Sequence, residues 1–422
     1  MDNYAHQACI RCRKQKRKCS RLLPVCARCK RLNLTRLYHG TVEDYTPPAS
    51  PLESSLPVPD VSSHTLQSHV YSIIGGDSSV AQSAAAYFGT IHSWFPIINR
   101  DVFYRNLRRH TEPPAELSLL TMCMYLLGIL PADSRINRLY IFLSGLVVSF
   151  AAAGVNTLGL LESRLLLSLF EVGHGMYSAA YISMGANIRA VTLYKKSHPV
   201  EEAEDAERVW KGLSILDRYI SLEMGQASSS LKEIPSQDKS AAQQPFANLY
   251  RASTLLEPVL AHIFNEAPFE QKSAEAIPLL ERLAALRNSI GEKDQKHLAY
   301  PATAVCSSTF MTLLEFGYGL EYPLGKDCRP LSFALLEVEV QQFIRIAEGF
   351  SKTLSTDNVA NMSFFLIHSI GKSAIIILRH FRESPTIDVP SSLECLVGLL
   401  EKLKKRWSAA GDYLDKIRRE QE

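Results

Sequence analysis

Residues 9–29 of this 422-residue chain read Cys9-Ile-Arg-Cys12-Arg-Lys-Gln-Lys-Arg-Lys-Cys19-Ser-Arg-Leu-Leu-Pro-Val-Cys26-Ala-Arg-Cys29. The cysteines form two pairs, each separated by two residues, with Cys19 between them. A pair at this spacing can bind one Zn²⁺ from a single turn of the chain, and two such pairs complete a tetrahedral shell of thiolates. The stretch therefore predicts a small module that folds around zinc.

The same stretch is strongly basic. Residues 1–40 contain eleven Lys and Arg against one acidic residue, Asp2, so the overall formal charge of +3 hides a basic arm on an acidic body. Phosphate neutralisation and counterion release supply most sequence-independent affinity for nucleic acid, which makes a polyanion the expected partner. Acidic proteins and membrane surfaces would attract the same charges, but neither needs cysteines at ligand spacing.

On these residues the arm resembles the fungal Zn2Cys6 (zinc binuclear cluster) transcription factors. Their pattern is Cys-x2-Cys-x6-Cys, a loop that usually contains Pro, and then Cys-x2-Cys-x6-Cys. The basic run between Cys12 and Cys19 looks like the reading helix of the family, and Pro24 falls in the loop. The resemblance implies Zn²⁺ as the cofactor and double-stranded DNA as the partner. The metal ligands that it implies are Cys9, Cys12, Cys19, Cys26 and Cys29.

One position departs from the family pattern, because Arg36 stands where the sixth cysteine is expected. In the family the first and fourth cysteines bridge two metals, which implies Cys9 and Cys26 here. One zinc site then keeps four thiolates, and the second keeps three. A guanidinium has no lone pair to donate and carries the wrong charge, so water or His39 are the alternatives for the vacancy. We expect weakened, metal-sensitive DNA binding, and an error in the gene prediction at this position stays open.

The resemblance also implies roles for the basic residues. Lys16 matches the lysine that reaches the guanines of a CGG triplet in the major groove. Gln15 stands where the family often has a second basic residue, although backbone carbonyls of that turn can contribute. For each basic residue singly, a solvated surface charge is the plain alternative. The expected phosphate contacts, which position the module without reading sequence, are Arg13, Lys14, Arg17, Lys18 and Lys30.

Three parts are predicted along the chain: the DNA-binding domain 1–40, a linker 41–69 rich in Pro and Ser, and a helical domain 70–422. No heptad repeat follows the cysteines. Symmetric binding of two triplets is thus unsupported, and a single triplet or dimerisation through the body stays open.

The helical domain is indicated by apolar residues at helical spacing. Val209, Leu213, Leu216, Ile220 and Met224 show it most clearly. Similar spacings occur in 165–172, 179–191, 247–263, 274–286, 331–346, 364–378 and 393–403. The predicted fold class is therefore all-α, with two short helices around metal in the amino-terminal module and a large helical regulatory domain behind it.

Two stretches of this domain are similar to the family's helical regulatory region. They are the aromatic-Pro run at 94–100 and the R-x-W and D-R motifs at 208–210 and 217–218. Asp217 and Arg218 are expected to form an ion pair between packed helices, and a ligand-sensing pair is the alternative.

Other readings of the chain are weaker. The uncharged stretch 139–161 is long enough to span a membrane, but Ala153-Gly154-Val155-Asn156 predicts a break between two buried helices. Gly371-Lys372-Ser373 ends like a phosphate loop but lies in a continuous helical pattern. No catalytic motif is found, which predicts that the chain is not an enzyme. A zinc enzyme would need an open metal site and a general base, and no base is apparent. Cys123, Cys306, Cys328 and Cys395 are expected to be reduced core thiols.

The chain is thus predicted to be a nuclear, sequence-specific regulator of RNA polymerase II genes, without a membrane span, that meets the transcription machinery or co-regulators. Its 422 residues leave no extended activation tail, which resembles pathway-specific regulators of secondary-metabolite gene clusters. The alternative is an interaction or ligand-sensing co-regulator whose degenerate finger does not bind DNA. Target genes, the sign of regulation, oligomeric state and any effector cannot be inferred from the sequence.

Overall fold

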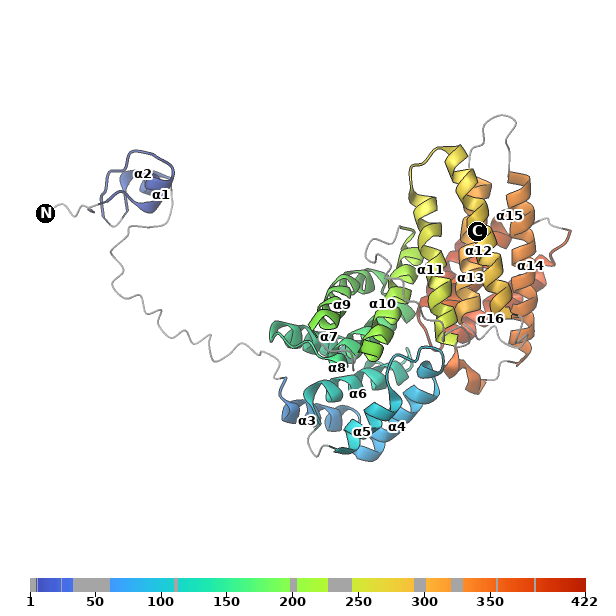
Figure 1. Cartoon of the computed structure of the whole chain (residues 1–422), viewed down its shortest axis with the longest axis horizontal. Coiled ribbons are helices and arrows are strands. Elements are labelled where there is room, and N and C mark those ends of the chain that lie inside the picture. Colours follow the sequence, from blue (N-terminus) through green and yellow to red (C-terminus); the bar gives the residue numbers. More distant parts are fainter. Residues whose placement is uncertain are drawn as a thin grey trace. The chain divides into compact units, whose positions relative to one another are not determined.

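A computed structural model describes residues 5, 7–23, 25–32, 61–109, 113–197, 203–226, 245–291, 301–319, 329–353, 356–382 and 385–422. Within these residues the regular elements are helices and there is no strand, which confirms the predicted all-α class. The chain divides into two compact units, Met1–Val58 and Pro59–Glu422 (Figure 1).

The first unit contains two short helices, α1 (Ile10–Lys14) and α2 (Ala27–Arg31). Both begin directly after a cysteine in extended conformation, Cys9 for α1 and Cys26 for α2. Helices of five residues are unstable alone in water, because too few hydrogen bonds offset the ordering of the first turn. Their stability must come from the sulfur cluster that both helices share.

The second unit is built from long helices. They are α3 (Ser63–Ile73), α4 (Asp77–Gly89), the 3₁₀ turn η2 (Ile91–Ser93), α5 (Arg100–Arg109), α6 (Ala115–Gly128), α7 (Ile136–Ala152), α8 (Leu158–Gly173), α9 (Tyr177–Ser197), α10 (Ala203–Met224), α11 (Pro245–Phe264), α12 (Phe269–Gly291), α13 (Pro301–Gly319), α14 (Arg329–Thr353), the 3₁₀ turn η4 (Thr356–Asn361), α15 (Phe365–His380), α16 (Val389–Lys404) and α17 (Ala409–Gln421).

The helical part starts earlier than residue 70, because α3 occupies residues 63–73 and so enters the range 41–69 that the sequence assigns to a linker. Ser62 explains the start. Its side-chain oxygen accepts a hydrogen bond from the N–H of Thr65, which satisfies one of the free donors of the first turn. Residues 41–60 of the expected linker, and residues 33–40 of the expected DNA-binding domain before it, lie outside the described part of the chain.

One continuous hydrophobic core runs through the second unit. Helix α10 packs on α8, α9 and α11, and so connects the amino-terminal helices α3–α9 with the bundle that α11–α17 form (Figure 1). Aromatic rings fill the centre of the core. Trp94 meets the rings of Phe364 and Phe365 edge-on at 5.8 and 6.1 Å, so the predicted aromatic-Pro stretch packs against the start of α15.

The helical segments predicted from apolar spacing fall inside helices of the structure, except that Phe364 caps α15 and precedes its first residue. The uncharged stretch 139–161 is divided between α7 and α8. Gly154, with φ of +74°, ends the first of them, as the sequence indicates. Among the described residues, none of the helices combines the length and the apolar character that crossing a bilayer requires.

The Gly371-Lys372-Ser373 motif lies within α15, which excludes a phosphate loop at this point and confirms the helical prediction. Gly371 has a packing role instead. A Cβ atom there would lie 2.0 Å from Cδ1 of Tyr413, so α15 and α17 approach each other closely only because residue 371 has no side chain.

Candidate metal centre and nucleic-acid interface

Four cysteine sulfurs converge in the first unit. The Sγ atoms of Cys9, Cys12, Cys19 and Cys26 all lie within 4.8 Å of one another. Two of these separations are 3.8 Å, from Cys9 to Cys26, and 3.9 Å, from Cys12 to Cys26. The first, second and fourth of these cysteines are buried, whereas Cys19 is half-buried.

This cluster has the dimensions of a zinc site. Four sulfurs bound to one Zn²⁺ at about 2.3 Å in a tetrahedron lie about 3.8 Å apart, which matches the separations of the two pairs given above. None of the four forms a disulfide, since all are free thiols. The residues present therefore fit one zinc ion with four thiolate ligands, and the chain carries a zinc site.

A fifth sulfur adjoins the cluster. Cys29 Sγ lies 3.8 Å from Cys9 Sγ, and the Cys29 N–H donates to Cys26 Sγ at 3.4 Å. Cys29 thus adjoins Cys9 and Cys26, the two cysteines that the resemblance implies as bridging ligands. Bridging of two metals by these residues stays a prediction. Arg36 and His39, on which the completion of a second site depends, lie outside the described residues.

Crowding of the sulfurs disfavours the free thiolates. The hydrogen bond with Cys26 is the largest of several causes that raise the pKa of Cys29 to about 11, and burial raises the pKa of Cys12 well above its usual range. A metal ligand must be deprotonated, so zinc binding has to displace protons from these sulfurs. Zinc uptake by this module is therefore coupled to pH and to folding.

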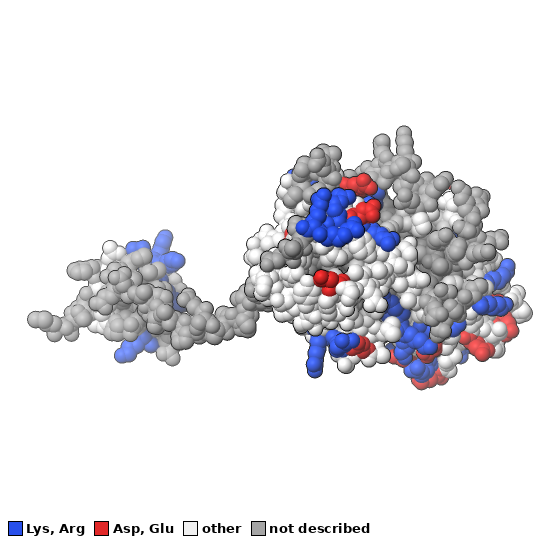
Figure 2. All heavy atoms as spheres, turned by 90° about the horizontal axis from the view of Figure 1, so that it is seen from below, with Lys and Arg blue, Asp and Glu red and all other residues white. Residues whose placement is uncertain are grey.

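The surface around the cluster is cationic. The side chains of Arg13, Lys14, Arg17, Lys18 and Lys30, which the sequence assigns to phosphate contacts, are all exposed. Asp2, the one acidic residue of the predicted domain, lies outside the described residues. Figure 2 shows blue side chains without red ones in the described part of this unit, whereas blue and red lie close together on the visible face of the helical unit.

Lys16 has an unusual backbone conformation. It lies just beyond α1 with φ of +51°. Its N–H donates to the carbonyl of Arg13 at 3.1 Å, and the N–H of Arg17 donates to the carbonyl of Cys12 at 2.8 Å. This pair of bonds ends the helix in a Schellman motif, whose left-handed residue is usually Gly. The reading segment is thus one short helix and a left-handed turn, not a helix that extends to the third cysteine.

Arg218, from the predicted ion pair of the helical unit, has a partner on another helix. Arg218 on α10 is 1% exposed and binds Glu257 on α11, with its Nε and one terminal nitrogen 3.0 and 2.9 Å from Glu257 Oε2. Arg218 therefore joins two packed helices. This supports the expectation of a structural ion pair between packed helices, in which Glu257 is a partner of Arg218.

The other cysteines do not form a second cluster among the described residues. Cys123 and Cys306 are buried, Cys395 is half-buried, and all three are free thiols. Burial raises the pKa of Cys306 to about 12, which keeps its thiol protonated. Cys328 lies outside the described residues.

Comparison with known proteins agrees with both units. Residues 7–36 match the fungal Zn(2)-Cys(6) binuclear cluster domain, and residues 84–237 match the fungal specific transcription factor domain. The transcription factor BOA15 of Botryotinia fuckeliana (strain B05.10) is 30% identical over 130 residues, which cover 28% of this chain and 70% of that protein. No solved structure matches.

These matches support DNA-binding transcription regulation with zinc as the cofactor, and they point to a role other than catalysis. The cysteine geometry, the cationic surface and the helical second unit agree with that assignment. The chain belongs to the fungal Zn2Cys6 transcription factors.

Proposed function

We propose that this protein regulates transcription from the nucleus by reading a CGG-type triplet through its zinc module. In this proposal Cys9, Cys12, Cys19 and Cys26 hold one zinc ion. Cys29, with Cys9 and Cys26, contributes to a second site that takes its remaining ligand from outside the cysteine set. The observation that carries the proposal is the convergence of four sulfurs at zinc spacing beneath an exposed cationic surface.

Lys16 is proposed as the residue that reads the bases. Its left-handed backbone directs the chain away from the axis of α1 at the carboxyl end of the helix. The Cys12 and Arg13 carbonyls at the same end accept the bonds of the left-handed turn, and each carbonyl oxygen keeps a second lone pair. An exposed ammonium beside these carbonyls offers both donors and acceptors to the edges of guanine and cytosine.

The neighbouring cations are proposed to hold the module on the sugar-phosphate backbone. They are Arg13, Lys14, Arg17, Lys18 and Lys30. Each phosphate contact lowers the logarithm of the binding constant by about 0.9 for every tenfold increase in salt, whatever the sequence of the duplex. Lys16→Ala should therefore reduce the preference for CGG, whereas Lys18→Ala should weaken binding to all duplexes alike.

The decisive experiment titrates the zinc-loaded full chain with a fluorescent CGG duplex and with a scrambled duplex at two salt concentrations. The proposal predicts tighter binding to CGG and a steep loss of affinity with salt. Equal affinity for both duplexes would instead support the co-regulator reading, in which the module does not select DNA sequence. Arg36→Cys, measured beside the unchanged chain, reports how much affinity the missing sixth ligand removes.

The wider biological role also belongs to this proposal. We propose that the helical unit modulates transcriptional output through co-regulators, that the chain has no catalytic role, and that its targets form a pathway-specific set such as a secondary-metabolite gene cluster. The last statement is supported by the family resemblance alone. Expression profiling of a deletion strain tests it, and a scattered set of unlinked target genes would contradict it.

A further inference from the structure

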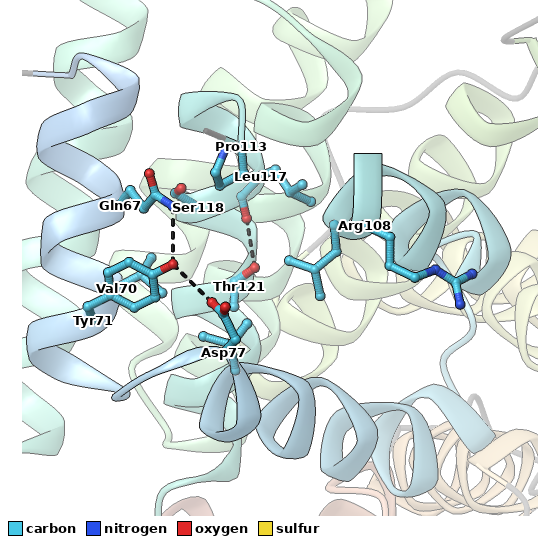
Figure 3. A pocket seen from close by; sticks show the side chains of 11 residues that line it. Gln67, Val70, Tyr71, Asp77, Arg108, Pro113, Leu117, Ser118 and Thr121 are labelled. Atoms are coloured by element: carbon cyan, nitrogen blue, oxygen red, sulfur yellow. Dashed lines mark hydrogen bonds between the residues drawn. The ribbon is translucent and has the colours of Figure 1, made fainter. Parts of the chain in front are cut away.

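A cavity of about 480 Å³ lies between helices α3, α4, α5 and α6 of the helical unit (Figure 3). Pockets that bind small molecules in proteins typically measure about 300–1,000 Å³ and combine apolar walls with a few converging polar groups. The walls here follow that pattern. Their apolar members are Val70, Val80, Leu107, Pro113 and Leu117.

Polar groups from three helices meet on one side of this cavity. Gln67 Nε2 donates to the Tyr71 hydroxyl at 3.2 Å, and that hydroxyl donates to Asp77 Oδ1 at 2.9 Å. Thr121 Oγ1 donates to the carbonyl of Leu117 at 2.8 Å. Figure 3 shows these bonds as dashed lines around the same space. The tyrosine and threonine protons are thus already used, so both hydroxyls offer mainly acceptor lone pairs to a ligand.

Ser118 marks the inner wall. It is 3% exposed, and its hydroxyl has no hydrogen-bond partner within the described part of the chain. Thr121, one turn later on α6, shows the usual solution for a helical hydroxyl, a bond to the carbonyl four residues earlier. A buried hydroxyl that forgoes this bond needs an explanation, and a ligand atom in the adjoining cavity supplies one.

Charge narrows the class of ligand. Among the described residues that line the cavity, Asp77 is the carboxylate and Arg108 is the cation, and Asp77 lies in the first turn of α4, where the helix dipole favours a negative charge. Since Tyr71 also donates to it, Asp77 does not require a cation. The guanidinium of Arg108 points away from Tyr71 and Asp77 (Figure 3). An anionic ligand would therefore meet Asp77 without a cation between them.

We propose that this cavity binds a small, uncharged, apolar molecule that carries hydroxyl groups. The ligand hydroxyls donate to Asp77 and Thr121 and accept from Ser118, while the apolar body fills the space against the aliphatic walls. Helix α3 supplies one side of the cavity through Gln67 and Tyr71. Ligand binding thus holds α3, the first described helix after the zinc module, against α6. The proposal goes beyond DNA recognition and does not depend on it.

The test titrates the zinc-loaded full chain with 4-butylresorcinol by isothermal calorimetry. A probe of this size is expected to bind one site with a dissociation constant of about 0.1–1 mM. The comparison probe is its dimethyl ether, which keeps the ring, the alkyl chain and the acceptor oxygens but has a methyl group in place of each donor proton. Losing its hydrogen bonds should weaken binding about tenfold or more. Hydrogen exchange should show protection of residues 63–73 by the diol and not by the ether.

Two variants and a control locate the site. Ser118→Ala should weaken binding of the diol about fivefold, because it removes one hydrogen bond. Ser308→Ala is the matched control: the Ser308 hydroxyl is equally buried and has no partner among the described residues, but it lies on α13 and not on the cavity wall. The affinity of the Ser308→Ala chain for the diol should not change. Tyr71→Phe, at a residue that is 43% exposed, provides a second variant that does not endanger folding. It should also bind the diol more weakly, because the Tyr71 hydroxyl holds the Asp77 carboxylate in place for the ligand.

Several results would overturn the proposal. They are the absence of saturable binding at about ten times the expected dissociation constant, equal affinity for the diol and its ether, or unchanged affinity in a folded Ser118→Ala or Tyr71→Phe chain. Tighter binding of hexylammonium than of the diol would show that Asp77 selects a cation, and the uncharged class would then be wrong.

Discussion

Replacing Lys16 with glycine separates the reading of DNA from the folding of the module. Lys16 occupies the left-handed position that ends α1, with φ of +51°. Glycine reaches this conformation without the clash that a Cβ atom causes. The substitution Lys16→Gly therefore removes the proposed base-reading ammonium while it relieves the backbone. Most substitutions that impair DNA binding also impair the fold, and this one is expected not to.

The magnitudes follow from the two effects. A left-handed conformation costs an L-residue about 1–2 kcal/mol, and part of this gain is offset by the greater freedom of glycine in the unfolded chain. The module should thus become more stable by about 0.5–1 kcal/mol. A lost contact to guanine removes about 1–3 kcal/mol of discrimination, which is roughly a five- to 150-fold loss of preference for CGG over a scrambled duplex.

The assay measures both quantities on the full chain. Zinc retention against a chromogenic chelator reports the stability of the module, and fluorescence anisotropy with two duplexes reports preference. Lys18→Ala serves as the control, because a phosphate contact affects both duplexes equally. If Lys16→Gly retained the preference for CGG, Lys16 would not be the reader. If the variant released zinc faster than the unchanged chain, the strain assigned to this turn would be wrong.

Three further outcomes test the fold and the metal. Gly371→Ala places a Cβ 2.0 Å from Tyr413 and should lower the free energy of unfolding, measured in urea, by about 1–3 kcal/mol. Gly398→Ala is the control: this glycine lies in α16 with nothing within 4 Å of an added Cβ, so the substitution should raise the free energy of unfolding by about 0.5–1 kcal/mol. Burial raises the pKa of Glu162 to about 8 from 4.5, so the folded chain retains a proton that the unfolded chain releases, and stability should fall as the pH rises between these values. Glu162→Gln should abolish that slope in thermal melts and gain up to about 3 kcal/mol near pH 7, with no gain near pH 4. Chelation of zinc should abolish DNA binding without lowering the melting temperature of the helical unit, since the two units are compact separately; a large loss of helical circular dichroism would contradict this.

Apolar residues at helical spacing are the main signal that the sequence gives. Helix α10 is an example, because Val209, Leu213, Leu216 and Ile220 recur at that spacing and are buried in a helix that packs on α8, α9 and α11, although Met224 at its end is exposed. Helix α6 shows no such pattern, since almost every residue from Ala115 to Leu127 is buried. A helix that is apolar all round has no periodicity to detect. The same reason applies to α13, which packs against α11, α12, α14 and α15 and is buried on most of its sides.

The sulfur cluster could be anticipated because its ligands are close in sequence, and their spacing restricts how the chain can fold around a metal. The left-handed conformation of Lys16 could not be anticipated. The residue that usually adopts it at the end of a helix is glycine, and a lysine in the sequence does not indicate such a turn. The cavity was missed for another reason. Tyr71, Asp77 and Ser118 come from three helices, and only the packing of those helices brings their side chains together.

The position of the missing cysteine relative to α1 decides what its loss can affect. Three of the four sulfurs that lie within 4.8 Å of one another belong to the segment around α1. Cys9 directly precedes α1, Cys12 lies in its first turn, and Cys19 follows the left-handed turn at its end. These ligands fix both ends of the reading segment without any contribution from residue 36. Cys29, the ligand expected only in the second zinc site, lies in α2, and Arg36, at the position of the missing cysteine, follows α2 in the chain. Loss of the sixth ligand should therefore loosen α2 and its phosphate contact through Lys30, while the segment that carries Lys16 keeps a complete tetrahedral anchor.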